Sequence, residues 1–250
     1  MSARFEELAW AATPLGEVSL RRRREPVTGR EVHEVKLGEE FLMSSLFTVA
    51  EEELARLALA RLTGTDLSVV VGGLGLGYTA RAVLEDPRVR DLVVVDALEP
   101  VIAWHQQHLV PLGQELTTDG RCRLVHGDFF AMAAGGGLDP DHPGALADAV
   151  VVDIDHSPRH LLADGSAPFY RLSGTEALAR LIRPGGVYAL WSNDPPDESY
   201  LEILRAVFTD VTAEVVEFPN PLQDRTSTNT VYLGTVTDRE TGSTLSRSPT

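Results

Sequence analysis

A chain of 250 residues, 43% of them hydrophobic and 24% charged, is long enough for one sizeable globular domain with a small appendage. Its formal net charge of −15 argues against a broad surface for nucleic acid or anionic membranes, which requires clustered Lys and Arg. The N-terminus lacks an apolar signal core, no stretch is long enough to span a membrane, and the single cysteine, Cys122, cannot form an internal disulfide. These features predict a cytoplasmic protein.

The first part of the chain, residues 1–47, has the pattern of a small β region. The segments "GEVSLRRRR" and "REVHEVKLG" flank "EPVTG", whose Pro and Gly suit a turn, so a β-hairpin is predicted. The arginine run at residues 21–24 is interpreted as the solvated face of a strand rather than a polyanion site.

From Thr48 onward, short apolar runs alternate with helical patterns. A helix is predicted for "TVAEEELARLALARL", and strands for "SVVVGG", "LVVVDA", "CRLVHGD", "DAVVVDID" and "VYALWSND". Strands that are apolar almost throughout indicate a parallel sheet with helices on both faces. The last two strand patterns, "DVTAEVVEF" and "TNTVYLGTV", have no helix between them and predict an antiparallel hairpin that closes a seven-stranded α/β sheet.

This pattern divides the chain into three expected parts. They are the N-terminal β-hairpin region at residues 1–47, a nucleoside-binding catalytic domain at 48–236, and a polar, disordered tail at 237–250.

Ligands of open parallel sheets bind beyond the carboxyl ends of the strands, so the residues there are the candidate site. The first strand ends in a glycine loop in which Gly72, Gly73, Gly75 and Gly77 permit a tight turn and close approach of a ligand. The second strand ends in Asp96, a carboxylate suited to the two hydroxyls of a ribose. The alternative for Asp96 is a helix cap.

The next two strand ends are also acidic. The third strand ends in Asp128, which can accept a hydrogen bond from an adenine amino group. The fourth ends in "DIDHSP", which places Asp153, Asp155 and His156 at the same edge of the sheet. Polar residues and glycine turns on four strand ends together predict a nucleoside-binding site.

Two other groups of residues have simpler explanations. His105 and His108 lie three residues apart on a predicted helix, but no acid or cysteine cluster completes a metal site, and no metal is expected. Phe169, Tyr170 and Trp191 could form an apolar wall around an alkyl chain or a cation, or could be core residues.

The order and spacing of these motifs resemble the S-adenosylmethionine-dependent methyltransferase superfamily and, within it, the spermidine synthase (polyamine aminopropyltransferase) family. The resemblance runs from about Thr13 to Val236 and includes "VVVDALEPVIAWHQQHL", "HGDFF" and "DAVVVDIDHSP". It implies a Rossmann-like class I methyltransferase fold and a homo-oligomer in which the N-terminal hairpin, at about residues 13–40, mediates self-association.

The resemblance also implies roles for the site residues. The glycine loop would lie under the sulfonium of decarboxylated S-adenosylmethionine or of S-adenosylmethionine itself. Asp96 would bind the ribose, Asp128 and Phe129 the adenine, and Asp153 would face the transferred group and a small-molecule amine.

The sequence departs from the family in the half of the site that would hold the amine. The family loop usually reads GGGDGG, with an Asp that holds the amine of the aminopropyl group, and that position is Gly75 here. A Tyr-His segment is replaced by "TVAEEELAR". The family's proton-accepting Asp corresponds to His156, while Asp155 lies one place earlier. An extended chain would favour Asp155 as the base, whereas a turn at Asp155 would bring His156 into the cleft.

Three functions remain open at this point. The first is a spermidine synthase-like transfer of an aminopropyl group to a small amine, and the second is methyl transfer to a small molecule from S-adenosylmethionine. The third is a non-catalytic homologue that binds a nucleoside.

Overall fold

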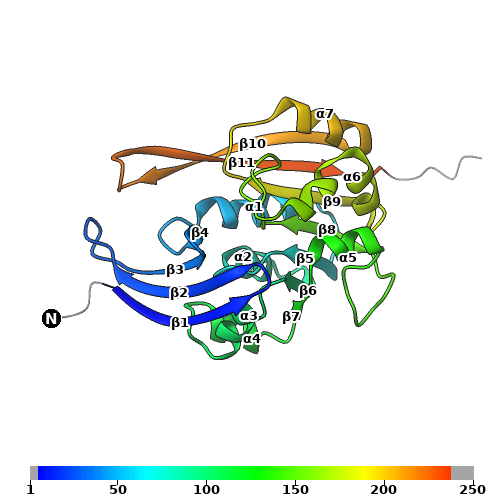
Figure 1. Ribbon diagram of the computed structural model, residues 1–250. Helices are drawn as coiled ribbons and strands as arrows, with labels where there is room; N and C mark the ends of the chain where they lie inside the picture. Colours follow the sequence, from blue (N-terminus) through cyan, green and yellow to red (C-terminus); the bar gives the residue numbers. More distant parts are fainter. Residues whose placement is uncertain (1–4, 238–250) are drawn as a thin grey trace, which may run out of the picture.

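The computed structural model describes residues 5–237, which form two β-sheets and the helices that surround the larger one (Figure 1). The smaller sheet is antiparallel, with the strand order β1-β2-β3-β4. Its strands are Phe5–Thr13 (β1), Gly16–Arg24 (β2), Glu31–Leu37 (β3) and Glu40–Ser44 (β4). The predicted hairpin is therefore only the middle of this sheet, β2 and β3.

The predicted hairpin is present, and two further strands that the sequence analysis did not identify, β1 and β4, extend it to a four-stranded sheet. β1 has the sequence FEELAWAAT, which is rich in Glu, Leu and Ala and has little intrinsic preference for a strand. Antiparallel pairing with β2, from Phe5 opposite Arg23 to Thr13 opposite Gly16, holds it extended. In the arginine run, Arg22 pairs with Glu6 at 2.6 Å and Arg23 with Glu34 at 2.8 Å, as expected for a strand face.

The larger sheet confirms the predicted α/β fold of seven mostly parallel strands closed by an antiparallel hairpin. Its strand order is β10-β11-β9-β8-β5-β6-β7. The strands are Leu67–Gly72 (β5), Val89–Asp96 (β6), Cys122–His126 (β7), Ala147–Val152 (β8), Ile182–Ser192 (β9), Thr209–Asn220 (β10) and Arg225–Thr235 (β11). β10 and β11 form the closing hairpin.

Helices connect the strands of this sheet. They are Val49–Ala60 (α1), Tyr78–Leu84 (α2), Glu99–Gln106 (α3), Gly113–Thr118 (α4), Phe129–Gly135 (α5), Leu172–Ala179 (α6) and Glu198–Val207 (α7), with a 3₁₀ segment at Asp164–Tyr170 (η1). In the part of the chain that the structure describes, no helix is long and apolar enough to cross a bilayer.

Alternation along the buried strands separates two apolar cores, one on each face of the sheet. Val69 and Val71 of β5 pack with residues of α1 to α4, whereas Val70, between them, packs on the other side with residues of α5 to α7. Side chains of an extended strand point to opposite faces in turn, so an all-apolar strand requires helices on both sides. The sheet is thus fixed as the middle of three layers.

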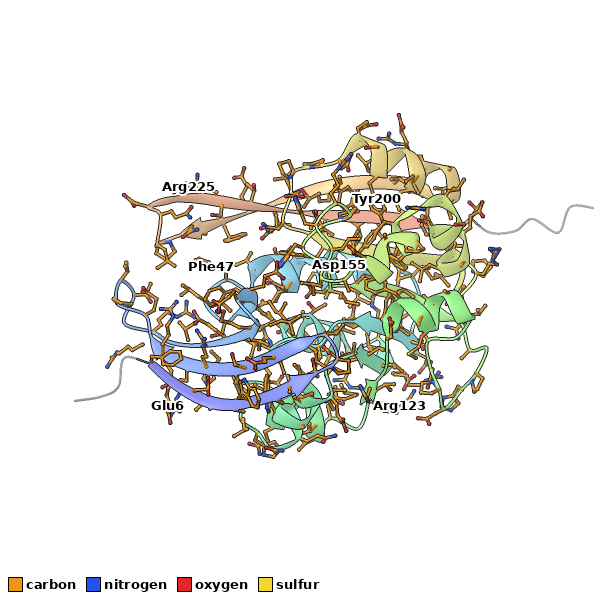
Figure 2. The ribbon with its side chains drawn as sticks, in the orientation of Figure 1. Glu6, Phe47, Arg123, Asp155, Tyr200 and Arg225 are labelled. Atoms are coloured by element: carbon orange, nitrogen blue, oxygen red, sulfur yellow. The ribbon has the colours of Figure 1, made fainter. Side chains whose placement is uncertain are left out.

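The N-terminal sheet packs against the core that contains α1 to α4. Val18, Leu20 and Val35 are completely or almost completely buried in that core. A second contact joins the segment after β4 to the closing hairpin, since the rings of Phe47 and Phe218 lie 5.9 Å apart. Figure 2 shows Phe47 on the side of the molecule toward which this hairpin extends. The docked sheet lies over the edge at which the parallel strands end.

The expected division at residues 47 and 236 stays a prediction. Residues 238–250, nearly all of the expected tail, lie outside the described residues.

Candidate active site

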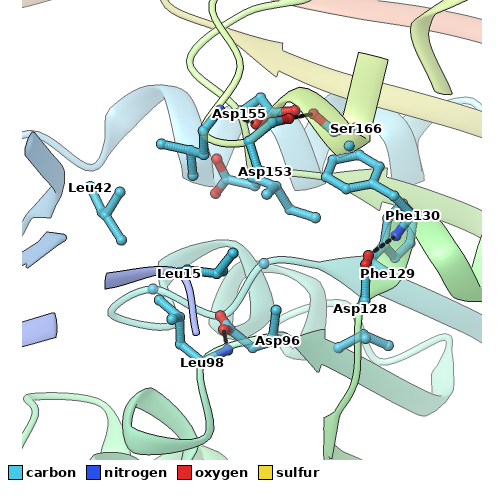
Figure 3. Close-up of a pocket in the computed structure, with 18 of the residues that line it drawn as sticks. Leu15, Leu42, Asp96, Leu98, Asp128, Phe129, Phe130, Asp153, Asp155 and Ser166 are labelled. Carbon is cyan, nitrogen blue, oxygen red and sulfur yellow. Dashed lines mark hydrogen bonds between the residues drawn. The ribbon is translucent and has the colours of Figure 1, made fainter. Parts of the chain in front are cut away.

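A cavity of about 660 Å³ lies at the carboxyl ends of β5, β6, β7 and β8. Its wall on the side of the N-terminal sheet includes Pro14 and Leu15, from the turn between β1 and β2, and Leu42 and Met43 of β4. Figure 3 shows Asp153 and Asp155 on one side of this space and Asp96 on the opposite side. The two sheets therefore enclose the predicted site together.

The glycine loop contributes two of its four predicted residues to the lining, Gly73 and Gly75. Gly73 has φ +97°, and a Cβ there would lie 2.0 Å from the carbonyl oxygen of Asp153. Gly75 has φ +49°, and its Cβ would lie 2.9 Å from Sδ of Met43. Since L residues with side chains rarely adopt such positive φ values, glycine permits both this path and the close contacts.

The other two predicted glycines are buried beside the cavity rather than in its wall. A Cβ at Gly72 would lie 2.8 Å from the ring of Phe129, and one at Gly77 would lie 2.5 Å from Leu116. Both glycines allow neighbouring elements to pack closely around the loop. Their assignment to cofactor binding stays a prediction.

Asp96 is half-buried at the end of β6 and accepts two backbone hydrogen bonds. The N–H of Leu74 donates to Oδ2 at 2.8 Å and the N–H of Leu98 donates to Oδ1 at 2.7 Å. Burial raises the pKa of Asp96 although these hydrogen bonds oppose the shift. The carboxylate thus holds the glycine loop and the start of α3 in place, and each oxygen keeps a second lone pair for a ligand.

Asp128 caps α5, with the N–H groups of Phe130 and Ala131 donating to Oδ1 at 3.0 and 3.1 Å. Its other carboxylate oxygen makes no hydrogen bond to any described residue. Phe129 and Phe130 form the adjoining end of the cavity, as Figure 3 shows. An acceptor beside aromatic rings suits a flat heterocycle with an amino group.

Asp153 follows β8 and accepts a hydrogen bond of 2.7 Å from Oγ1 of Thr79, at the start of α2. Burial raises the pKa of Asp153 despite that hydrogen bond. The carboxyl therefore retains its proton to a higher pH than an exposed aspartate does.

The chain bends directly after this position, at Asp155 and His156. Asp155 is 1% exposed and accepts hydrogen bonds from the N–H of Leu162 at 2.7 Å and from the hydroxyl of Tyr170 at 2.9 Å. The half-buried His156 also lines the cavity, and its ring makes no hydrogen bond to any described residue. Of the two sequence alternatives, the turn that brings His156 to the cleft is the one observed.

Glu51, in the first turn of α1, is a lining residue that the sequence analysis missed. Burial and the nearby carboxylate of Asp153 raise the pKa of Glu51. In the sequence it belongs to a run of three glutamates that resembles a solvated helix face. Only the fold brings the start of α1 next to the end of β8.

The charged lining is dominated by acids. The carboxyl-bearing lining residues are Glu51, Asp96, Asp128, Asp153 and Asp155. Two histidines, His126 and His156, also line the cavity, whereas none of the described lining residues is Lys or Arg. An acidic cavity of this kind favours cationic ligands.

Comparisons with known proteins agree with this arrangement, although no family model matches the chain. The chain is 32% identical over 153 residues to polyamine aminopropyltransferase 2 of Pseudomonas aeruginosa, an alignment covering 57% of this chain and 40% of that protein. It is 28% identical over 180 residues to a polyamine aminopropyltransferase of Prochlorococcus marinus, covering 68% and 54% respectively. The chain thus spans about half the length of the curated relatives it matches.

The solved structures extend the likeness to the fold. The crystal structure of spermidine synthase from Thermotoga maritima superimposes with a TM-score of 0.69 over 92% of this chain and 72% of that one, at 14% identity. This chain has the fold of spermidine synthase. A spermidine synthase in complex with the transition-state analogue AdoDATO gives the same TM-score and coverage at 13% identity. The chain therefore has the fold that its motifs predicted.

Proposed function

We propose that this chain transfers an aminopropyl group from decarboxylated S-adenosylmethionine to a small-molecule amine. The single observation that carries the proposal is the charge of the cavity, with five carboxyl groups and no Lys or Arg among the described lining residues. The decarboxylated donor bears a sulfonium and an ammonium and no carboxylate, so it matches this lining. The names of the curated relatives, polyamine aminopropyltransferases, support the same activity.

The proposed reaction is a displacement at carbon. The lone pair of the acceptor nitrogen forms a bond to the methylene carbon next to the sulfonium, and the electron pair of the broken C–S bond moves to sulfur. The products are a neutral thioether, methylthioadenosine, and the alkylated amine. The site must align nitrogen, carbon and sulfur and must take one proton from the nitrogen.

The proposed roles follow from the positions of the side chains. Gly73 and Gly75 border the sulfonium, Asp96 binds the ribose, and Asp128 with Phe129 receives the adenine. His156 is the proposed proton acceptor, because its ring is free toward the cavity among the described residues. Asp155 holds the turn through Leu162 and Tyr170.

Methyl transfer from S-adenosylmethionine is the second candidate, favoured by one observation. Gly75 has no carboxylate where the family usually has one, and an acid there would bind the amine of the decarboxylated donor and repel a carboxylate. The acidic lining weighs against this candidate, because the carboxylate of S-adenosylmethionine would find no basic side chain among the described residues.

Mass spectrometry of reaction mixtures tests both candidates. The purified protein is incubated with each sulfonium and a panel of mono- and diamines. We expect an aminopropyl gain on an amine, and methylthioadenosine, only with the decarboxylated donor. A methyl gain with S-adenosylmethionine would establish the second candidate. No product together with no binding of methylthioadenosine would exclude both, whereas binding without product would point to a non-catalytic nucleoside-binding homologue.

A further inference from the structure

The sulfur of Met43 lies against Gly75, the position at which the family usually has an aspartate. Met43 of β4 lies against Gly75, where its Sδ accepts a hydrogen bond of 3.2 Å from the N–H of Leu76. A side chain at Gly75 would collide with this sulfur and would be strained by φ +49°. An acid therefore cannot be accommodated at Gly75 unless Met43 moves.

A carboxylate reaches the same cavity from another element. Glu51 lies in the first turn of α1, lines the cavity and is close enough to Asp153 for the two carboxyl groups to repel each other. Among the described residues no side chain donates a hydrogen bond to the carboxyl group of Glu51. A half-buried carboxyl with an acid as neighbour is costly to ionise without a cation.

The neighbouring arginines do not supply that cation. Arg56 pairs with Glu52, Glu53 and Glu85, and Arg81 pairs with Glu52 and Glu85. The other titratable side chains that line the cavity are acids or histidines, including Asp96, Asp155 and His156. The positive charge that would balance Glu51 and Asp153 must therefore come from the ligand.

We infer that Glu51 and Asp153 together bind the ammonium group of the donor's aminopropyl chain, so that α1 supplies the acid that Gly75 lacks. The inference rests on the proposed function and names a residue that selects the decarboxylated donor. An ammonium group has three N–H donors and can bond to both carboxylates, which removes their mutual repulsion. A donor with a carboxylate beside that ammonium would place a negative charge next to both acids.

Calorimetric titration of three proteins with two nucleosides tests the inference. The proteins are the wild type, Glu51→Gln, and the control Glu52→Gln, in which the adjacent acid, paired with Arg56 and Arg81, is altered. The ligands are decarboxylated S-adenosylmethionine and methylthioadenosine, which lacks the ammonium and the aminopropyl chain. We expect Glu51→Gln to weaken binding of the decarboxylated donor about 10- to 100-fold and to leave methylthioadenosine binding unchanged. Glu52→Gln should change neither affinity.

The outcomes separate this inference from the proposed function. Equal donor affinity of the wild type and Glu51→Gln would overturn the inference alone. A higher KM for the acceptor amine with unchanged donor affinity would also overturn it, because Glu51 would then bind the acceptor. A wild type that binds neither nucleoside would refute the proposed function itself. A matched loss of methylthioadenosine affinity in Glu51→Gln would indicate a damaged cavity and would contradict an ammonium-specific role.

Discussion

The carboxyl group of Glu51 lowers the stability of the unliganded protein because its charged form is poorly solvated and lies near Asp153. A carboxyl whose pKa is raised in the folded state binds more protons there than in the unfolded chain, between the two pKa values. Stability therefore falls as the pH rises through that interval. The same carboxylate that is proposed to attract the donor thus costs free energy when the cavity is empty.

Glu51→Gln should consequently stabilise the unliganded protein, and the gain should be larger near pH 9 than near pH 5. A rise of one in the pKa corresponds to about 1.4 kcal/mol, or about 3–6 °C in Tm for a chain of this size. Thermal unfolding monitored by circular dichroism at the two pH values measures the difference. Glu52→Gln, which loses ion pairs with Arg56 and Arg81, should not show this gain. A gain for Glu51→Gln that is independent of pH would show that its charge is not responsible.

Single residues also show how far the sequence could predict the site. Asp96, Asp128 and Asp153 were predictable because each follows a recognisable apolar strand, and strand ends of a parallel sheet meet at one edge. Glu51 was not predictable as a site residue, because it belongs to a helix whose start is brought to the cavity only by tertiary packing. The same holds for Leu15 and Leu42, which reach the cavity from the N-terminal sheet.

At the scale of elements, two adjacent residues in the segment after β8 have different roles, one structural and one proposed to be catalytic. Asp155, a nearly buried lining residue, accepts hydrogen bonds at both oxygens, from Leu162 and Tyr170, whereas the ring of the half-buried His156 makes none to any described residue. Figure 2 shows Asp155 in the interior of the molecule, below Tyr200. The bend at these residues separates the anchoring group from the group proposed to move a proton.

Substitutions of His156 and Asp155 should therefore affect different properties, turnover in the first case and stability in the second. We expect His156→Ala to lower turnover about 100-fold or more at saturating donor, with Tm nearly unchanged, since proton-transfer assistance is lost. Asp155→Asn should lower Tm, because a buried hydrogen bond to Leu162 or Tyr170 is weakened at a cost of about 1–3 kcal/mol. Turnover assays and thermal unfolding of both variants make the comparison. Equal, small effects on turnover would mean that neither residue is the base.

The elements themselves were predictable to different degrees. The apolar runs of β5, β6 and β8 need cover on both faces, which fixed the α/β class from sequence. β1 and β4 were missed because one is rich in helix-forming residues and the other is only five residues long. Pairing with β2 and β3 determines both, and that information is not local.

At the scale of the whole molecule, the N-terminal sheet leaves several large apolar side chains exposed. Trp10 is 53% exposed, Phe41 54% and Phe5 46%. Apolar groups concentrated on one small sheet are typical of a surface that is covered by a partner. The prediction that this region mediates self-association is consistent with that exposure and is still to be tested.

Trp10→Glu should lower the mass of the particle in solution without unfolding it. A charge at a buried apolar contact between copies is costly, whereas the same charge on an exposed surface is tolerated. Multi-angle light scattering gives the mass, and Val215→Glu, on the distant strand β10 and 50% exposed, is the matched control. A wild type that is monomeric, or a Trp10→Glu variant and a Phe41→Glu variant that both keep the wild-type mass, would contradict the prediction.

The absence of Lys and Arg from the described cavity lining also bears on product release. In the proposed transfer the sulfur is positively charged before the reaction and neutral after it, and the amine that gains the aminopropyl group carries the new cationic nitrogen away. The carboxylates that retain the donor therefore lose much of their hold on the spent nucleoside. Methylthioadenosine should therefore bind more weakly than the donor, because the bond that breaks also removes the positive charge on the sulfur.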